Sequence, residues 1–401
     1  MPPRPSLRSF LSLARGKLSA SPSQRELPLT FVVGNESADL DSLCSAVIFA
    51  YLRTTANAQA QKVHIPISNL SRDDLRLRSE MTAVLAYVGL KPQDLLTLDD
   101  LPNGEAAPGS GDTTWYLVDH NSPTGIIKER YGGRIAGCID HHADENYVPE
   151  DGNPRVIETC GSCVSLIVEC CRDAWDSLAS EARESKDAAE ADRGMALMAL
   201  GVIFSDTVNL KAKEKVTPRD VDAVEYLEKK LGGTDYDREK YCDEIEKVRR
   251  DLDGLSFRDI FRKDYKEWVE NGLKLGTCSV IQNIEYLLAR AGSGDVLMKE
   301  LGRWAEEKSL DLVSIMTLAT HDDGKYERQV LLWGLNEKAA KASREFERVS
   351  GDELELQAFE GGSLDLDAHG QWRKAWKQGN LKHSRKQIAP MIRDAMNGVG
   401  S

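Results

Sequence analysis

The stretch "TFVVGNESADLDS", residues 30–42, decides the fold, because it joins a buried strand to a helix through a turn rich in acids. The apolar residues 31–33 have the composition of a strand, and they are followed closely by Asn35, Asp39 and Asp41. Carboxylates this close together repel one another unless a cation lies between them. The stretch therefore predicts a metal ion at the end of a strand.

The rest of the first half alternates short strands with helices. Strands are predicted for "KVHIPISNL", "WYLVDHN" and "RIAGCIDHH", and helices for "SLCSAVIFAYLRTTA", "SEMTAVLAYVGL", "GSCVSLIVECCRDAW" and "GMALMALGVIFSDT". This alternation is typical of an α/β domain with a mostly parallel sheet flanked by helices.

The pattern changes near Leu255, where three strand candidates share a shorter region with one long helical stretch. They are "LKLGTCSVIQ", "LDLVSIMTLAT" and "RQVLLWGL". We expect a smaller α+β domain here, with the active site in the cleft between the two domains. The predicted organisation is an N-terminal basic segment, 1–27, a metal-binding domain, 28–235, a connecting helix, 236–254, and a C-terminal domain, 255–401.

Composition limits the possible partners. The net charge is 52 − 65 = −13, which argues against a protein that coats nucleic acid with a basic surface. No apolar run approaches the ~18 residues of a membrane span, so we expect no membrane partner. The eight cysteines are scattered, which favours reduced thiols and a cytoplasmic protein.

The N-terminal segment allows two interpretations. Residues 1–26 contain five Arg or Lys residues and no acid before Glu26, a composition found in mitochondrial presequences. The helical spacing of the apolar residues equally suits a helix docked on the domain: Leu7, Phe10, Leu11, Ala14 and Leu18. Mitochondrial delivery therefore stays open beside the cytoplasmic expectation.

Several predicted elements of the first domain end in residues that can bind metals. Asp119 ends one strand, Asp140, His141 and His142 end another, and Asp206 ends an apolar run. The carboxyl ends of parallel strands face one crevice, so these groups can meet. The set is rich in oxygen, which suits Mg²⁺, Mn²⁺ or Co²⁺. The alternative is that Asp39 and Asp41 only cap a helix and the Asp-His-His run is an ordinary turn.

Two ions sharing one aspartate would lie about 3.5 to 4 Å apart. Water between them becomes hydroxide near neutral pH, and the ions offset charge during an in-line attack on phosphorus. The expected chemistry is hydrolysis of a phosphoanhydride or a phosphodiester.

The motifs resemble a known superfamily. In chain order, "GNESADLDS", "LVDHN", "IDHH", "GS" before an apolar helix, and "SDT" followed by "TPRD" resemble the DHH phosphoesterases. "SRKQIAP", residues 384–390, resembles the second-domain signature of family II inorganic pyrophosphatases, fungal-type exopolyphosphatases and prune-like proteins. The "GS" pair, with Ser162, can either cap its helix or offer backbone N–H groups to an anion.

The resemblance implies a role for each matched residue. Asp119 would bridge the two ions, His142 would contact the phosphate under attack, and Arg385 with Lys386 would hold phosphates from the second domain. Asn35 stands where family II pyrophosphatases have a histidine, and "GNESADxDS" is characteristic of the exopolyphosphatases. The full implied metal-ligand set is Asp39, Asp41, Asp119, His141 and Asp206.

The basic run 371–396 contains eight Arg, Lys or His residues and one acid, Asp394. A polyphosphate chain needs such a cationic path. The phosphate-binding candidates in this run are Lys382, His383, Ser384, Arg385 and Lys386; for Lys377, Lys382 and His383 the alternative is a solvated helix face.

The resemblance thus implies an exopolyphosphatase that releases terminal orthophosphate from linear inorganic polyphosphate by two-metal hydroxide attack. Nucleoside polyphosphates are further candidate substrates, and we expect a monomer. The alternatives are an inorganic pyrophosphatase, which Asn35 disfavours, and a prune-like protein acting mainly as a scaffold.

Overall fold

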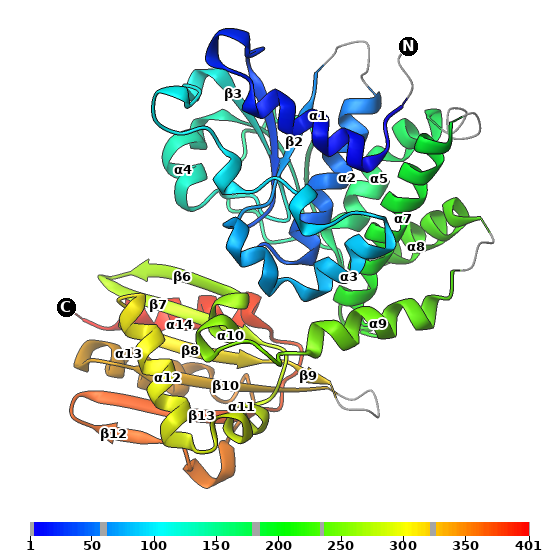
Figure 1. Ribbon diagram of the computed structural model, residues 1–401. Coiled ribbons are helices and arrows are strands. Elements are labelled where there is room, and N and C mark those ends of the chain that lie inside the picture. The colour runs from blue at the N-terminus through cyan, green and yellow to red at the C-terminus, as the bar shows by residue number, and fades with distance from the viewer. Residues whose placement is uncertain (1–3, 57–61, 179–184, 233–235, 321–325, 401) are drawn as a thin grey trace. The chain divides into compact units, whose positions relative to one another are not determined.

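The chain forms two compact units in the computed structural model, Met1–Arg249 and Arg250–Ser401 (Figure 1). The residues described are 4–56, 62–178, 185–232, 236–320 and 326–400. The predicted α/β class is confirmed, with a parallel sheet in the first unit and a mixed sheet in the second.

The first unit is built on a five-stranded sheet in the order β2-β1-β3-β4-β5, and every neighbouring pair is parallel. The chain builds outward from β1 to β2 and then continues on the other side of β1 with β3. The order therefore reverses between β1 and β3, which is where ligands bind in open sheets of this kind. The strands are β1 Leu29–Val33, β2 His64–Ile67, β3 Thr113–Val118, β4 Ile135–Asp140 and β5 Arg155–Ile157.

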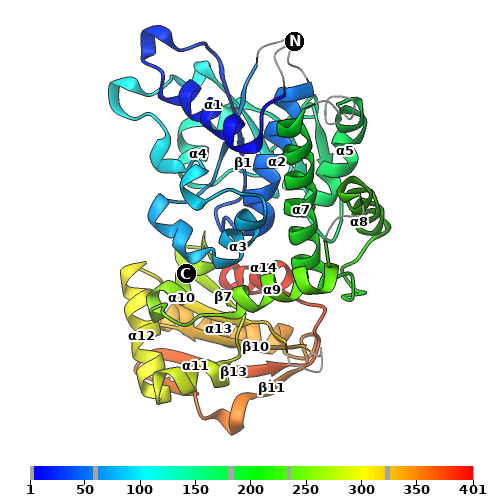
Figure 2. The ribbon, with the colours of Figure 1, turned by 45° about the vertical axis from the view of Figure 1, so that its right-hand side comes forward.

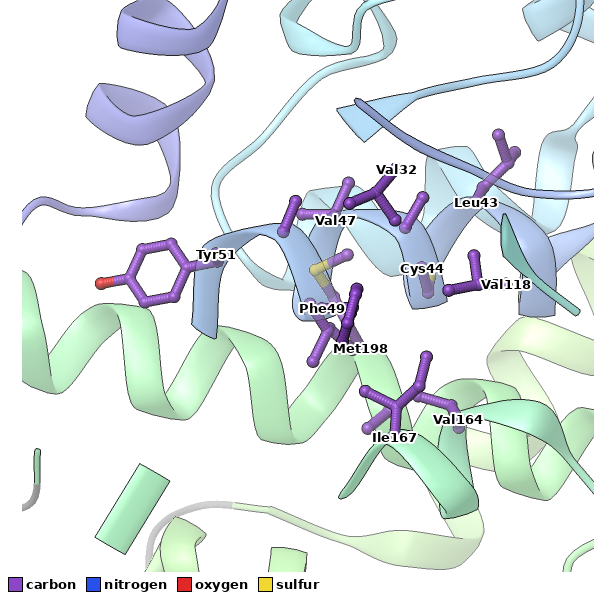
Figure 3. Close-up of a cluster of buried hydrophobic side chains, with 14 of the residues drawn as sticks. Val32, Leu43, Cys44, Val47, Phe49, Tyr51, Val118, Val164, Ile167 and Met198 are labelled. Atoms are coloured by element: carbon purple, nitrogen blue, oxygen red, sulfur yellow. The ribbon is translucent and has the colours of Figure 1, made fainter. Parts of the chain in front are cut away.

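Helix α2, Leu40–Ala56, lies between the sheet and two further helices, α5, Cys163–Ser177, and α7, Lys186–Thr207. Figure 3 shows Val32 and Val118 of the strands on one side of α2 and Val164, Ile167 and Met198 of the other helices nearby. Nearly all of α2 is buried, which explains why its sequence is apolar all round.

Further helices in the described part of this unit are α1 Leu7–Ser19, α3 Ser79–Tyr87, α4 Gly125–Tyr131, α8 Pro218–Leu231 and α9 Arg238–Arg250. Helices α5, α7 and α8 lie together (Figure 2). In the described residues we find no helix whose length and apolar character would let it span a bilayer.

The N-terminal segment is bound into the first unit. The predicted apolar stripe of α1, which includes Phe10, is buried in the core. Arg4 is only 4% exposed, donates from Nε to the Tyr51 hydroxyl at 3.0 Å, and pairs with Asp192. Asp192 also accepts from the indole of Trp175 at 2.7 Å. Removing the segment would therefore leave a buried carboxylate without its cation.

The second unit contains a mixed sheet in the order β11-β13-β10-β8-β7-β6, with β12 paired to β13 and β9 to β10. Among the described strand pairs of this unit, β7–β8 is parallel and the others are antiparallel. The strands are β6 Tyr265–Glu270, β7 Leu273–Val280, β8 Leu312–Thr317, β9 Ala319–Thr320, β10 Tyr326–Gly334, β11 Leu356–Ala358, β12 Leu366–Ala368 and β13 Gln371–Gln378.

Two separate apolar clusters flank this sheet, so it is covered on both faces. The strands β7, β8 and β10 are the three predicted ones. Residues 371–378 form a strand, so Lys377 does not lie on a solvated helix face. Trp372 and Trp376 are buried against α13 and α14. The burial of these two side chains stabilises a strand here despite the basic residues around them. The helices are α10 Phe257–Lys263, α11 Ile284–Ala291, α12 Gly294–Glu307, α13 Glu337–Ser350 and α14 Arg385–Gly398.

His64 on β2 predicts a pH dependence of stability. Burial, followed by the nearby charges of Arg53 and Lys62, lowers its pKa from 6.5 to about 4. Between pH 6.5 and 4 the unfolded chain therefore binds a proton at His64 that the folded protein does not. The free energy of unfolding is unaffected by this group above pH 6.5 and falls as the pH drops towards 4. We expect His64 to account for about 3 kcal/mol of that loss.

Urea unfolding of the protein and of His64→Phe at pH 7 and pH 4.5 measures this. The variant should lose less unfolding free energy between the two pH values. An equal loss in both proteins would contradict the prediction.

Candidate active site

The turn after β1 requires a glycine at its first position. A Cβ atom on Gly34 would lie 2.5 Å from the Cβ of Ser42, so only glycine lets the turn approach α2 this closely. The next residue, Asn35, donates its backbone N–H to the Ser42 hydroxyl at 3.0 Å. The turn is thus held against the start of α2, and Asp39 and Asp41 follow from it directly.

The orientation of the Asn35 side chain follows from its partners. Its Oδ1 accepts the backbone N–H of Ser37 at 2.9 Å and the Ser37 hydroxyl at 2.5 Å. A backbone N–H can only donate, so the oxygen must face Ser37 and Nδ2 must face the other way. Nδ2 donates to Asp119 Oδ2 at 2.6 Å. Asn35 therefore acts here as a hydrogen-bond donor to a carboxylate.

Asp119 follows β3 and is 2% exposed. It has a left-handed backbone conformation, φ 61°, which is uncommon for a residue other than glycine and is concentrated at functional sites. Its Oδ2 accepts from Asn35 and also from the Ser42 hydroxyl at 2.6 Å. Its Oδ1 faces His141, with 3.2 Å to Nε2. The two carboxylate oxygens thus have different surroundings.

The position of His141 fits a cation. Its Nδ1 lies 3.0 Å from the carbonyl oxygen of Cys160, which can only accept, so Nδ1 carries the proton. In a neutral ring Nε2 then presents a lone pair to Asp119 Oδ1 at 3.2 Å. Two acceptors at this distance need a proton or a metal ion between them. Carbonyl contacts of this kind also orient metal-binding histidines.

His142 is oriented by a buried carboxylate. Its Nδ1 lies 2.7 Å from Oδ1 of Asp140, which also accepts the backbone N–H of His141, while Asn121 donates to Oδ2 at 2.6 Å. Burial alone would raise the pKa of Asp140, but the hydrogen bonds from His142 and Asn121 lower it well below its usual value. Asp140 is therefore an anion whose oxygens are all used within the protein.

The contacts of Asp41 decide whether the "GS" pair caps its helix through Ser162 or offers backbone N–H groups to an anion. Its carboxylate accepts the backbone N–H groups of Cys163, at 2.7 Å, and Val164, at 3.1 Å, and the Ser162 hydroxyl at 3.1 Å. The start of α5 thus binds an anion, and that anion is Asp41. Ser162 does not cap α5 with its side chain.

A second carboxylate, Asp220 of "TPRD", supports the same helix start. It is fully buried and accepts from the backbone of Gly161 at 3.0 Å and the hydroxyl of Ser165 at 2.7 Å. Although burial opposes it, hydrogen bonds beginning with that from the Thr217 backbone lower the pKa of Asp220. Asp220 also forms a capping box with Thr217 at the start of α8, so one carboxylate holds the beginnings of two helices.

Asp39 and Asp206 complete the acidic group. Asp39 Oδ1 accepts the backbone N–H of Ser42 at 3.0 Å and so does cap α2. Asp206 lies in the last turn of α7, and its Oδ2 is buried with no hydrogen-bond partner among the described residues. A buried carboxylate oxygen without a donor fits a cation site.

The charges of these residues act on one another. Burial and the charge of Asp39 raise the pKa of Asp206, while His141 and Lys215 lower it. Burial and the charges of Asp119 and Asp206 raise the pKa of Asp41 well above its usual value. The group thus disfavours its own negative charge, and a bound cation would relieve this.

Two predicted metal ligands, Asp119 and His141, lie close to His142, which was predicted to contact phosphate. Ligand atoms of Asp119, His141 and His142 all lie within 4.8 Å of one another. Asp39, Asp41 and Asp206 act on this group electrostatically, although the carboxylate of Asp41 is engaged by α5. Asp140 was expected as a metal-competent residue and instead orients His142. Four further residues around the site were not predicted from sequence, because hydrogen-bond partners depend on the fold: Ser37, Ser42, Asn121 and Asp220.

The basic residues of the second unit are largely paired with acids from distant parts of its sequence. Arg385 Nη2 lies 2.8 Å from Asp264 Oδ1, and His383 Nε2 lies 3.0 Å from Glu353 Oε1. Ser384 caps α14, accepting the backbone N–H of Lys386. Lys382 is exposed. The strong charge seen in the linear run 371–396 is therefore partly neutralised in the folded unit.

Comparison with known families matches both units. The DHH family, N-terminal domain, matches residues 30–202, and the DHHA2 domain matches residues 243–395. The chain belongs to the DHH family and carries a C-terminal DHHA2 domain. It is a hydrolase of that family.

Several curated proteins are similar over most of the chain. A Schizosaccharomyces pombe protein named "Putative exopolyphosphatase" is 32% identical over 99% of this chain and 97% of its own length. "Exopolyphosphatase PRUNE1" of Rattus norvegicus is 28% identical over 93% of this chain and 77% of its own. A manganese-dependent inorganic pyrophosphatase of Methanothrix thermoacetophila is 25% identical over 71% of this chain and 80% of its own.

A solved structure shares the fold. The "Methanococcus jannaschii putative family II inorganic pyrophosphatase" aligns with a TM-score of 0.56 at 21% identity, covering 92% of this chain and all of its own.

Asp206→Asn tests the charge repulsion within the acidic group. Removing one charge should raise the melting temperature of the metal-free protein by about 2–4 °C and reduce the further rise caused by Mn²⁺. Differential scanning fluorimetry with EDTA and with Mn²⁺ measures both changes. Asp187→Asn, an exposed acid on the same helix, is the control. A lower metal-free melting temperature with an unchanged Mn²⁺ response would count against a cation site at Asp206.

Proposed function

We propose that the protein is a metal-dependent phosphoanhydride hydrolase that removes terminal orthophosphate from linear inorganic polyphosphate. The observation that carries the proposal is the contact between Nε2 of His141 and Oδ1 of Asp119, which lie 3.2 Å apart with a proton or a metal ion required between them, beside buried and mutually repelling carboxylates. The similarity to proteins named exopolyphosphatase supports the choice of substrate.

The candidate ligands are Asp39, Asp41, Asp119, His141 and Asp206, and their oxygen-rich set suits Mg²⁺ or Mn²⁺. Divalent ions bound there would acidify water and offset the charge of the phosphate groups. The unpartnered Oδ2 of Asp206 and the mutual charge repulsion of the acids support this assignment.

The protein's own groups would orient the substrate. Asp140 engages Nδ1 of His142, so contact with a phosphate oxygen would be made by Nε2 of the same ring. In the second unit, Asp264 engages one edge of the Arg385 guanidinium, which has further N–H groups for phosphate oxygens. Lys386 and the exposed Lys382 would add mobile point charges, and the N-cap Ser384 would place them at the start of α14. His383 is the weakest candidate, because Glu353 engages its Nε2.

The second candidate is an inorganic pyrophosphatase, favoured by the manganese-dependent relative and by the shared fold. A prune-like scaffold is a third possibility, but the complete set of candidate ligands favours an active enzyme. Asn35 separates the first two, because an imidazole at this position would add a strong ligand and an amide does not.

A substrate comparison tests the proposal. Purified protein with Mg²⁺ or Mn²⁺ should release orthophosphate from long-chain polyphosphate, and release little from pyrophosphate. Asp119→Asn should lower kcat about 100-fold or more, since it removes the charge facing His141. Asp187→Asn should match the unaltered protein. Fast pyrophosphate hydrolysis with inert polyphosphate would establish the second candidate instead.

Asn35→His tests the specificity argument. The variant should gain pyrophosphate hydrolysis relative to polyphosphate hydrolysis, because the amide donor to Asp119 is replaced by a metal-binding imidazole. The ratio of the two kcat/KM values, measured at fixed Mn²⁺, reports the change. An unchanged ratio would show that substrate choice depends on other residues.

A further inference from the structure

A buried chain of hydrogen bonds runs from Arg78, just before α3, to Asp119. Arg78 Nη2 donates to the Ser37 carbonyl at 2.5 Å, Ser37 donates to Asn35 Oδ1, and Asn35 Nδ2 donates to Asp119 Oδ2 at 2.6 Å. The four residues are between 2% and 5% exposed. Each link is therefore shielded from competition with water.

Arg78 is an unusual residue to bury for this purpose. Its Nε also donates to the Ala38 carbonyl at 2.7 Å, so the guanidinium binds two successive carbonyls of the turn. No carboxylate in the described part of the chain forms an ion pair with it, and its Nη1 is buried without a hydrogen-bond partner there. Burying a charge without a counter-charge is costly, so the contact with the turn must be specifically maintained.

The turn itself needs this support. Ala38 has a left-handed backbone conformation, φ 44°, which is unfavourable for a residue with a side chain. Arg78 holds the carbonyls of Ser37 and Ala38, and so stabilises the backbone between Asn35 and Asp39. Ser37 then supplies two donors to Asn35 Oδ1, which leaves Nδ2 as the only group that can face Asp119.

We propose that Arg78 and Ser37 are positioning residues that keep Asn35 as a hydrogen-bond donor to Asp119 and not as a metal ligand. Asp119 Oδ2 then has two donors, Asn35 and Ser42, and Oδ1 is the oxygen that faces His141. The inference rests on the metal-dependent function proposed above. Two residues that would touch neither metal nor substrate would thus decide whether Asn35 is a hydrogen-bond donor or a metal ligand.

Metal binding by the metal-free protein tests the inference independently of turnover. Isothermal titration of the EDTA-treated protein with Mn²⁺ should give a dissociation constant about 10-fold higher for Arg78→Met and about 5-fold higher for Ser37→Ala. Arg76→Met, an exposed arginine two positions earlier, and Ser343→Ala, a fully buried hydroxyl in the second unit, are the controls. Both should bind Mn²⁺ like the unaltered protein.

A double variant separates positioning from general loosening. If Arg78 acts through Asn35, adding Arg78→Met to Asn35→Ala should change the Mn²⁺ dissociation constant by less than about 2-fold. Fully additive effects would overturn the inference, as would unaltered Mn²⁺ binding by both Arg78→Met and Ser37→Ala. If the unaltered protein neither binds Mn²⁺ nor hydrolyses phosphoanhydrides, the proposed function itself fails, and the inference fails with it.

Discussion

The repulsion among carboxylates gathered at one edge of a parallel sheet is the constraint on which the first unit depends. Asp41, Asp119 and Asp206 come from three elements far apart in sequence, and burial together with mutual repulsion disfavours the charged forms of Asp41 and Asp206. Several kinds of positive or donating group compensate. The start of α5 binds Asp41, Asn35 and Ser42 donate to Asp119, and Nε2 of His141 lies 3.2 Å from the other oxygen of Asp119, where a proton or a metal ion is required.

This constraint explains features of the fold that have no other evident purpose. Gly34 lets the turn approach α2, and α2 can lie in the middle of the unit because its whole surface is apolar. The N-terminus of α5 then faces Asp41, and Asp220 supports it from the side of α8. A helix terminus, normally a site for substrate phosphate, is here used to hold a carboxylate of the protein.

Much of the architecture could be predicted because its signals are local. The strands β1 to β4 are short apolar runs, three of which are followed by or end in Asn35, Asp119 and Asp140, and α2, α5 and α7 are long apolar helices, so period and composition identified them. Strand β5 is three residues long and only partly buried, and it has no such signal. Strand β13 was not predicted, because its basic residues indicated a solvated surface. Their partners, Glu285 and Glu347, lie far away in the sequence, so the pairing has no local signal.

The sequence by itself determined the family, because the order of its motifs is that of the DHH family, and it indicated candidate metal ligands at or just after β1, β3 and β4. Only the tertiary structure decided how each group is used. It showed that Asn35 donates to Asp119, that Asp41 caps α5, and that Asp140 orients His142. The first two contacts join residues 84 and 122 positions apart in the chain, and a hydrogen bond is decided by which atoms face one another and not by residue type.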